Sequence, residues 1–211
     1  MANKTIAIVD INSFLKQNIE SLLFACILEK KVNKLSILDL NNFGQNKLLP
    51  EKDKWAKEGE ILTTTIFSNT SYQICLSAQP EQNKLINLAH TLHAVSDILI
   101  INANNQRHHY NSPFYQFADE VVIFADLEKD IIKNVLNFFM QHDLRKKKIL
   151  LFVHNYRENI QSEKTYLELL KQFKMLNITI CNIDCVPEFG SLKEIEQIDP
   201  WTNIYKKINL L

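Results

Sequence analysis

Asp97-Ile98-Leu99-Ile100-Ile101 is the most apolar short segment of the chain, and Asn102 follows it directly. An apolar run without polar alternation is typical of a strand that is covered on both faces of a sheet. Similar runs recur along the chain, and segments with apolar residues every three or four positions lie between them. The strand-type runs lie at 6–9, 35–40, 72–77, 121–124, 149–153 and 178–183, and the helix-type segments at 13–30, 80–95, 128–141 and 163–175.

This alternation of strands and helices predicts the fold class. Right-handed crossovers between successive strands give an α/β fold with a doubly wound, mostly parallel sheet and helices on both faces. We expect one domain over residues 1–211. A polar stretch with Gly44, Pro50 and Gly59 interrupts the pattern and is interpreted as loop and short helix. The tail from about residue 201 is interpreted as a further short helix.

Composition excludes several classes of function. The 211 residues include 24 basic and 24 acidic side chains, so net charge gives no general attraction to nucleic acid or membranes. Glycine occurs only 3 times, which argues against a glycine-rich phosphate loop. No apolar run approaches the length of a membrane span, and the N-terminus does not resemble a signal peptide. We therefore expect a cytoplasmic location.

Metal and cofactor sites are not expected. Cys181 and Cys185 flank a predicted strand, but no second Cys or His pair accompanies them. His90 and His93 are three residues apart on a predicted helix, and the sequence shows no further zinc ligands for them. We interpret these histidines as part of a surface or half-buried helix face.

Four segments, taken in order, resemble the ParA/MinD family of P-loop ATPases (SIMIBI class). They are the strand–loop–helix unit at 6–30, the strand at 35–41 that is similar to one ending in D-x-D, residues 97–104, which are similar to D-[FY]-[IV]-[IV]-[IV]-D-[ST]-P, and residues 118–123, which are similar to A-D-E-[VA]-[IL]-[VI]. The resemblance covers nearly the whole chain. It implies a P-loop NTPase-like fold of ParA/MinD topology, with a nucleotide site at the carboxyl ends of the strands.

The phosphate loop of that family, K-G-G-x-G-K-[ST], corresponds to residues 11–18, which contain no glycine. In the family the glycines admit phosphate to backbone N–H groups, the lysines neutralise charge and the hydroxyl holds Mg²⁺. The phosphate lysine corresponds to Gln17, the hydroxyl to Asn18 and the early lysine to Asn12. Lys16 is close but one position away.

The acidic positions of the family are changed as well. Asp39 matches the first aspartate of D-x-D, whereas the second corresponds to Asn41 and the Mg²⁺-side aspartate to Asn102. Loss at three separate loops predicts a pseudo-ATPase, which we expect to be no enzyme and to use no cofactor. Its role would be that of a scaffold, localisation or regulatory partner of a bacterial pilus, secretion, flagellar, cellulose-synthesis or partition system.

A second interpretation makes the chain an enzyme or ligand-binding protein that uses an asparagine-rich rim at the strand ends. The rim consists of Asn12, Asn41, Asn42, Asn102, Asn104 and Asn105. Asparagine is also an ordinary turn residue at such positions. Asp10 and Asp39, expected on adjacent strand ends, could pair as acid and base or bind a cation, and ordinary strand-end polar residues are the favoured interpretation.

A protein partner is expected at an aromatic cluster that follows the apolar strand at 98–101. Arg107 and Tyr110, with Phe114 and Tyr115, are residue types that interfaces favour. The family resemblance makes a homo- or heterodimer plausible. The basic run at 145–148 and the weakly amphipathic tail at 201–211 are candidates for DNA or lipid contact. A solvated turn and a packed tail are favoured, so nucleic acid is not an expected partner.

Overall fold

The apolar segment at 98–102 forms strand β6 (Ile98–Asn102), which lies in the interior of one large sheet. The computed structural model describes residues 3–11, 20–40, 48–50, 54–58, 60–75, 81–103, 108–126, 130–154, 160–176, 178–182 and 191–197. Within these residues nine strands follow the order β3-β4-β5-β2-β6-β1-β7-β8-β9. The other strands are β1 (Lys4–Asp10), β2 (Leu35–Asp39), β3 (Ala56–Glu58), β4 (Ile61–Ile66), β5 (Thr70–Cys75), β7 (Glu120–Asp126), β8 (Lys148–His154) and β9 (Ile178–Asn182).

Seven of these strands, from β5 to β9 along the sheet, pair in parallel, and β3 and β4 extend one edge in antiparallel fashion. The helices are α1 (Glu20–Leu28), α2 (Gln82–Val95), α3 (His108–Phe117), α4 (Ile131–Gln141), α5 (Ile160–Phe173) and α6 (Leu192–Gln197), with short 3₁₀ turns η3 (Leu144–Lys146) and η4 (Lys174–Leu176). The predicted α/β class with a mostly parallel sheet is confirmed.

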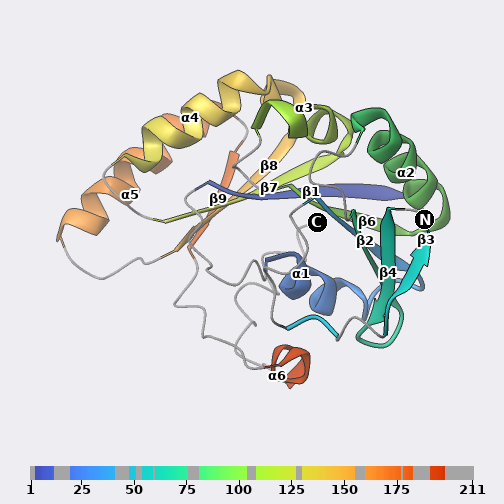
Figure 1. Cartoon of the computed structure of the whole chain (residues 1–211). Helices are drawn as coiled ribbons and strands as arrows, with labels where there is room; N and C mark the ends of the chain where they lie inside the picture. The colour runs from blue at the N-terminus through green and yellow to red at the C-terminus, as the bar shows by residue number, and fades with distance from the viewer. Residues whose placement is uncertain are drawn as a thin grey trace.

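Helices cover both faces of the sheet. Figure 1 shows α2, α3, α4 and α5 above the sheet and α1 and α6 below it. Alternate residues of each central strand enter different cores, as the pleat requires. In β1, Ile6 and Ile8 pack in the core around α1, whereas Ala7 and Val9 pack in the core under the four upper helices. Burial on both faces explains why these strands are apolar throughout.

Helix α1 is buried along its whole length, from Glu20 to Leu28. Phe24 makes edge-to-face contacts with Phe124 of β7 and Phe152 of β8, at ring-centroid distances of 6.0 and 5.8 Å. On the side facing α6, the Cys26 thiol donates to the carbonyl oxygen of Ile195 at 3.8 Å. Because α1 is packed on both sides, its first residue, the acid Glu20, is buried as well.

Several elements differ from the sequence prediction. The stretch interpreted as loop and short helix contains β3 and β4, and in β4 the alternate residues Leu62, Thr64 and Ile66 are buried. Helix α3 was not predicted because its sequence is polar and includes Pro113, a residue that disfavours helix interiors. Helix α6 was also not predicted. The predicted helix from residue 201 lies outside the described residues.

Candidate functional site

The candidate site lies where β2, β6 and β1 end side by side at the carboxyl edge of the sheet. Asp39 is in register with Asn102, and Asn102 is in register with Ile8, two residues before the end of β1. The prediction that Asp10 and Asp39 lie on adjacent strands is therefore wrong. The order β2-β6-β1 puts Asn102 between them, because the apolar strand β6 enters the sheet between the two earlier strands.

Asp39 is 6% exposed and is held by neutral donors. The hydroxyl of Tyr72 on β5 donates to Asp39 Oδ2, and Asn102 Nδ2 donates to Asp39 Oδ1 at 3.3 Å. A buried charge needs hydrogen bonds of this kind. Burial, and then the negative charge of Asp39, raise the pKa of Tyr72 well above its ordinary value, so its hydroxyl stays a donor.

Glu20 adds a third acid to this site from the first turn of α1. Glu20 is only 2% exposed, and its Oε1 atom has no hydrogen-bond partner among the described residues. Burial raises the pKa of Glu20 well above its usual range; the charge of Asp10 and a hydrogen bond with that side chain raise it further, and the charge of Asp39 adds to this. Burial thus favours the protonated form of the Glu20 carboxyl group.

Asp10, Glu20 and Asp39 together form what we call the carboxyl cluster. Among the described groups that shift the Glu20 pKa there is no basic side chain. In the described part of the chain, no set of three or more His, Cys, Asp or Glu side chains is arranged to hold a metal ion. The cluster therefore places buried negative potential at the edge where parallel α/β sheets bind their ligands.

Of the predicted site positions, the structure brings Asp39 and Asn102 into contact. Five other predicted positions lie outside the described residues, namely Asn12, Lys16, Gln17, Asn18 and Asn41. Sequence reasoning missed Glu20 and Tyr72. A partial signal for Glu20 existed, because residues 22–28, which directly follow Glu20 and Ser21, are apolar on every side of the helix, and such helices are buried. Tyr72 carried no comparable signal.

Part of the predicted partner interface is buried in the structure. Phe114 and Tyr115 are 1% and 0% exposed, so as placed they are core residues and present no surface to a partner. Tyr115 packs edge-to-face on Phe138 at 5.2 Å and donates its hydroxyl to the Ala103 carbonyl at 3.4 Å. The pair is buried because α3 lies on the sheet as a helix. Arg107 and the side chain of Tyr110 lie outside what the structure describes.

The two histidines of α2 lie at the opposite end of the strands from the carboxyl cluster. Their rings pack on Phe117, at 4.6 Å for the exposed His90 and 5.6 Å for the half-buried His93. His93 Nδ1 lies 2.9 Å from the Thr5 hydroxyl. The predicted surface or half-buried helix face is confirmed.

Comparison with known proteins gives matches in structure alone. No protein-family model matches the chain, and no curated protein matches its sequence. A plasmid partition protein from Borrelia burgdorferi superposes on 100% of this chain and 99% of its own, with TM-score 0.68 and 18% identity. The MinD cell division protein of Aquifex aeolicus gives 98% and 96% coverage, TM-score 0.60 and 11% identity. The structure of pNOB8 ParA bound to nonspecific DNA superposes on 98% of this chain and 97% of its own, with TM-score 0.64 and 9% identity.

At such low identities the likeness concerns the fold alone. The predicted ParA/MinD fold is confirmed, since the match covers nearly the full length of both partners in each comparison. No helix within the described residues is long and apolar enough to cross a bilayer.

Proposed function

We propose that this chain, which has the ParA/MinD fold, is a catalytically inactive, cytoplasmic scaffold, localisation or regulatory partner of a bacterial assembly such as a pilus, secretion, flagellar, cellulose-synthesis or partition system. The observation that carries the proposal is the carboxyl cluster. Two buried acids, Asp10 and Asp39, lie at the strand ends at which a nucleotide's phosphates would bind in this fold, and buried Glu20 adds a third from the first turn of α1. The sequence lacks the lysines and the Mg²⁺-side aspartate of the family pattern, so a triphosphate would meet an ionised carboxylate of this cluster without the cations that the family pattern supplies. The two charges then repel each other, and the repulsion is strong where water is excluded.

Magnitudes support the loss of nucleotide binding. Micromolar affinity corresponds to about 8 kcal/mol. Each charge-assisted contact to a phosphate contributes roughly 1.5–3 kcal/mol. The sequence lacks the two lysines, the hydroxyl and the Mg²⁺-side aspartate of the family pattern, whose positions correspond to Asn12, Gln17, Asn18 and Asn102. Loss of the two lysine contacts removes about 3–6 kcal/mol. Loss of the hydroxyl and the aspartate also removes groups on the Mg²⁺ side, and together these losses are enough to abolish useful affinity.

The test is a calorimetric titration with ATP and Mg²⁺, together with an assay of phosphate release. We expect no binding at ATP concentrations up to about 1 mM. A dissociation constant above this value corresponds to a binding free energy weaker than roughly 4 kcal/mol. An Asp10→Asn/Glu20→Gln variant removes acidic groups of the cluster without restoring the missing contacts, and we expect it to stay inactive too. Micromolar affinity or measurable turnover by the natural chain would overturn the proposal.

The alternative role of an asparagine-rich rim has little support from the described residues. Asn102, the one rim residue that the structure describes, is 5% exposed and its amide donates to Asp39. A buried amide that donates this hydrogen bond to Asp39 contributes to the stability of the fold. DNA is a separate alternative, because the pNOB8 ParA structure contains DNA. Gel-shift assays with duplex DNA test it directly, and we expect no complex at physiological salt.

A further inference from the structure

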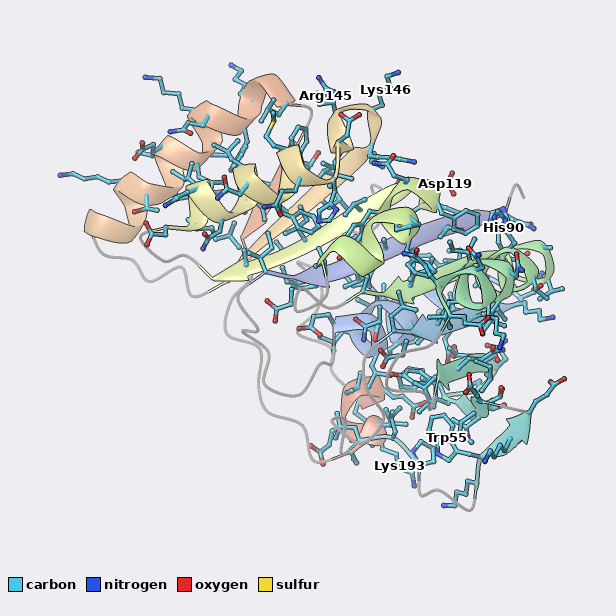
Figure 2. All side chains as sticks on the ribbon, turned by 45° about the horizontal axis from the view of Figure 1, so that its top comes forward. Trp55, His90, Asp119, Arg145, Lys146 and Lys193 are labelled. Carbon is cyan, nitrogen blue, oxygen red and sulfur yellow. The ribbon has the colours of Figure 1, made fainter. Side chains whose placement is uncertain are left out.

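Exposed apolar side chains are concentrated on two neighbouring helices. Among the described residues, four large hydrophobic side chains are exposed, and three of them lie on α4 and α5: Met140 (69%), Leu167 (56%) and Leu170 (38%). The fourth, Val95, lies on α2. Helices α4 and α5 run side by side in both views (Figures 1 and 2), and their inner faces share one core.

Basic side chains surround these apolar groups. Lys164 and Lys171 on α5 and Lys174 in η4 are exposed, and none of them forms an ion pair with a described residue. Residues 164, 167, 171 and 174 follow the spacing of one helix face, so Leu167 lies within a stripe of lysines. Figure 2 shows nitrogen-tipped side chains projecting from α5 away from the sheet.

The turn after α4 extends this charge. Arg145 and Lys146 are exposed, and Figure 2 shows them on the same side of the sheet as α5. Two described acids are nearby in sequence: Asp143 pairs with Arg145 at 2.6 Å and offsets that cation, and Glu168 accepts a hydrogen bond from the neutral side chain of Gln172 at 3.2 Å. The exposed cations Arg145, Lys146, Lys164, Lys171 and Lys174 outnumber these two acids, so the described part of this surface is locally positive. We call the exposed side chains of α4, η3, α5 and η4 the basic–apolar surface.

The composition of the basic–apolar surface favours one kind of partner. Protein interfaces are depleted of lysine and enriched in aromatic residues, and the exposed apolar groups here are Leu and Met among lysines. A nucleic-acid backbone would use the cations but gain little from exposed leucines. Leucines flanked by lysines are typical of helices that lie at a lipid headgroup layer, where long basic side chains reach the phosphates.

We propose that the basic–apolar surface docks reversibly on an anionic lipid bilayer. Met140, Leu167 and Leu170 would enter the headgroup region, and the lysines of α5 and η4 would contact lipid phosphates. The charge complementarity requires acidic lipid, and the small apolar area requires that binding be weak and sensitive to salt. This proposal does not rest on the loss of ATP hydrolysis, so the nucleotide titration and the lipid experiment can fail independently.

The experiment is flotation of the full chain with vesicles of phosphatidylcholine containing about 30% phosphatidylglycerol, against vesicles of phosphatidylcholine alone. We expect flotation with the acidic vesicles only, and its loss at about 0.5 M salt, where surface charges are screened. A Lys164→Glu/Lys171→Glu/Lys174→Glu variant should lower binding by more than about tenfold. A Met140→Ser/Leu167→Ser variant should also lower binding, although its charge is unchanged.

Two matched controls lie elsewhere on the molecule. A Lys54→Glu/Lys57→Glu/Lys193→Glu variant makes the same charge change at exposed positions, and Figure 2 shows Lys193 far from Arg145. Val95→Ser removes the remaining exposed apolar side chain on α2. All substituted side chains are exposed, and circular dichroism checks that each variant is folded. We expect the apolar control to bind like the natural chain and the charge control to retain most binding.

Three outcomes would overturn the assignment. The first is no flotation of the natural chain with acidic vesicles. The second is binding that the surface variants leave intact but that Ile204→Ser/Ile208→Ser in the C-terminal segment removes. The third is binding to duplex DNA without flotation, lost in the lysine variant and unchanged in Met140→Ser/Leu167→Ser.

Discussion

At the residue scale, burial and charge act on Glu20 in the same direction. Burial disfavours its carboxylate, and the nearby Asp10 and Asp39 disfavour it further. In an unfolded chain the Glu20 carboxyl would titrate near 4.5, whereas in the folded chain its pKa lies well above that value. The folded chain therefore binds more protons than the unfolded chain as pH rises above 4.5, and stability falls with pH in that window.

A Glu20→Gln substitution should remove this pH dependence. The favourable contribution of protonated Glu20 is complete below its unfolded pKa and is lost as pH rises toward its folded pKa, by up to about 1.4 kcal/mol per pH unit. Glutamine keeps the shape and carries no charge. We expect the variant to be more stable than the natural chain at neutral pH, with the difference shrinking toward pH ~4. Urea unfolding at several pH values measures it.

The matched control is Glu168→Gln, which changes an exposed glutamate on α5. It should leave the dependence of stability on pH as in the natural chain. If Glu20→Gln and Glu168→Gln gave the same pH profile, Glu20 would not carry a raised pKa.

The sequence located part of the site. Asp39 and Asn102 were predicted to share the strand ends, because parallel strands end at one edge, and the structure joins them by a hydrogen bond. Glu20 was not predicted, because an acid at a helix start is normally solvated. The apolar residues 22–28 indicate a buried helix, but tertiary packing decides that the burial extends to its first residue.

At the scale of elements, α1 is the helix on which the lower core depends. All nine of its residues are buried, and Phe24 contacts aromatic rings on two neighbouring strands. The rings of Phe124 and Phe152 stack on each other with centroids 5.2 Å apart, so the three phenylalanines form one cluster. Edge-to-face contacts of this kind add to the stabilisation that buried area supplies.

Phe24→Ala should lower the free energy of unfolding by about 3–5 kcal/mol, because it leaves a cavity between α1 and the sheet. Met140→Ala removes an exposed side chain of α4 and should change stability by no more than about 0.5 kcal/mol. Denaturant midpoints report both values. If Phe24→Ala prevents folding, Phe24→Leu gives a smaller loss in the same direction. A loss at Phe24 no larger than at Met140 would contradict the buried position of α1.

Strands with continuous apolar runs could be predicted, and the antiparallel strands β3 and β4 and helix α3 could not. β6 and β8 are continuous apolar runs, which is a strong signal. β4 has the sequence Ile-Leu-Thr-Thr-Thr-Ile. Because of its polar threonines, the sequence alone does not show that alternate residues are buried, which becomes clear only when β4 pairs with β5. In α3 the proline and the polar residues opposed the prediction of a helix, and burial of Phe114 and Tyr115 overrides them.

At the scale of the whole molecule, the two ends of the sheet differ in their charges. The carboxyl ends hold the carboxyl cluster. At the amino ends, Glu120 is 6% exposed and its Oε1 forms ion pairs with Lys4 at 2.8 Å and Lys148 at 3.0 Å. The ion pairs join β1, β7 and β8. The buried acid at the amino ends is thus paired with lysines, whereas at the carboxyl ends burial raises the pKa of Glu20 and Asp39 accepts hydrogen bonds from Tyr72 and Asn102.

The proposed loss of the nucleotide site predicts that ATP does not control association of the chain. Whatever its oligomeric state, the mass measured by sedimentation equilibrium should be the same with and without ATP and Mg²⁺. Sedimentation with ADP and Mg²⁺ is the control for effects of ionic strength. A mass that doubles with ATP alone would show a nucleotide-driven dimer and contradict this prediction.

A crystal structure of the chain grown with millimolar ATP and Mg²⁺ tests most directly whether this fold has lost its nucleotide site. We predict that the strand ends stay free of nucleotide, with Asp10, Glu20 and Asp39 buried together as described here. Density for a triphosphate seated against residues 12–18 beside these carboxyl groups would contradict the account.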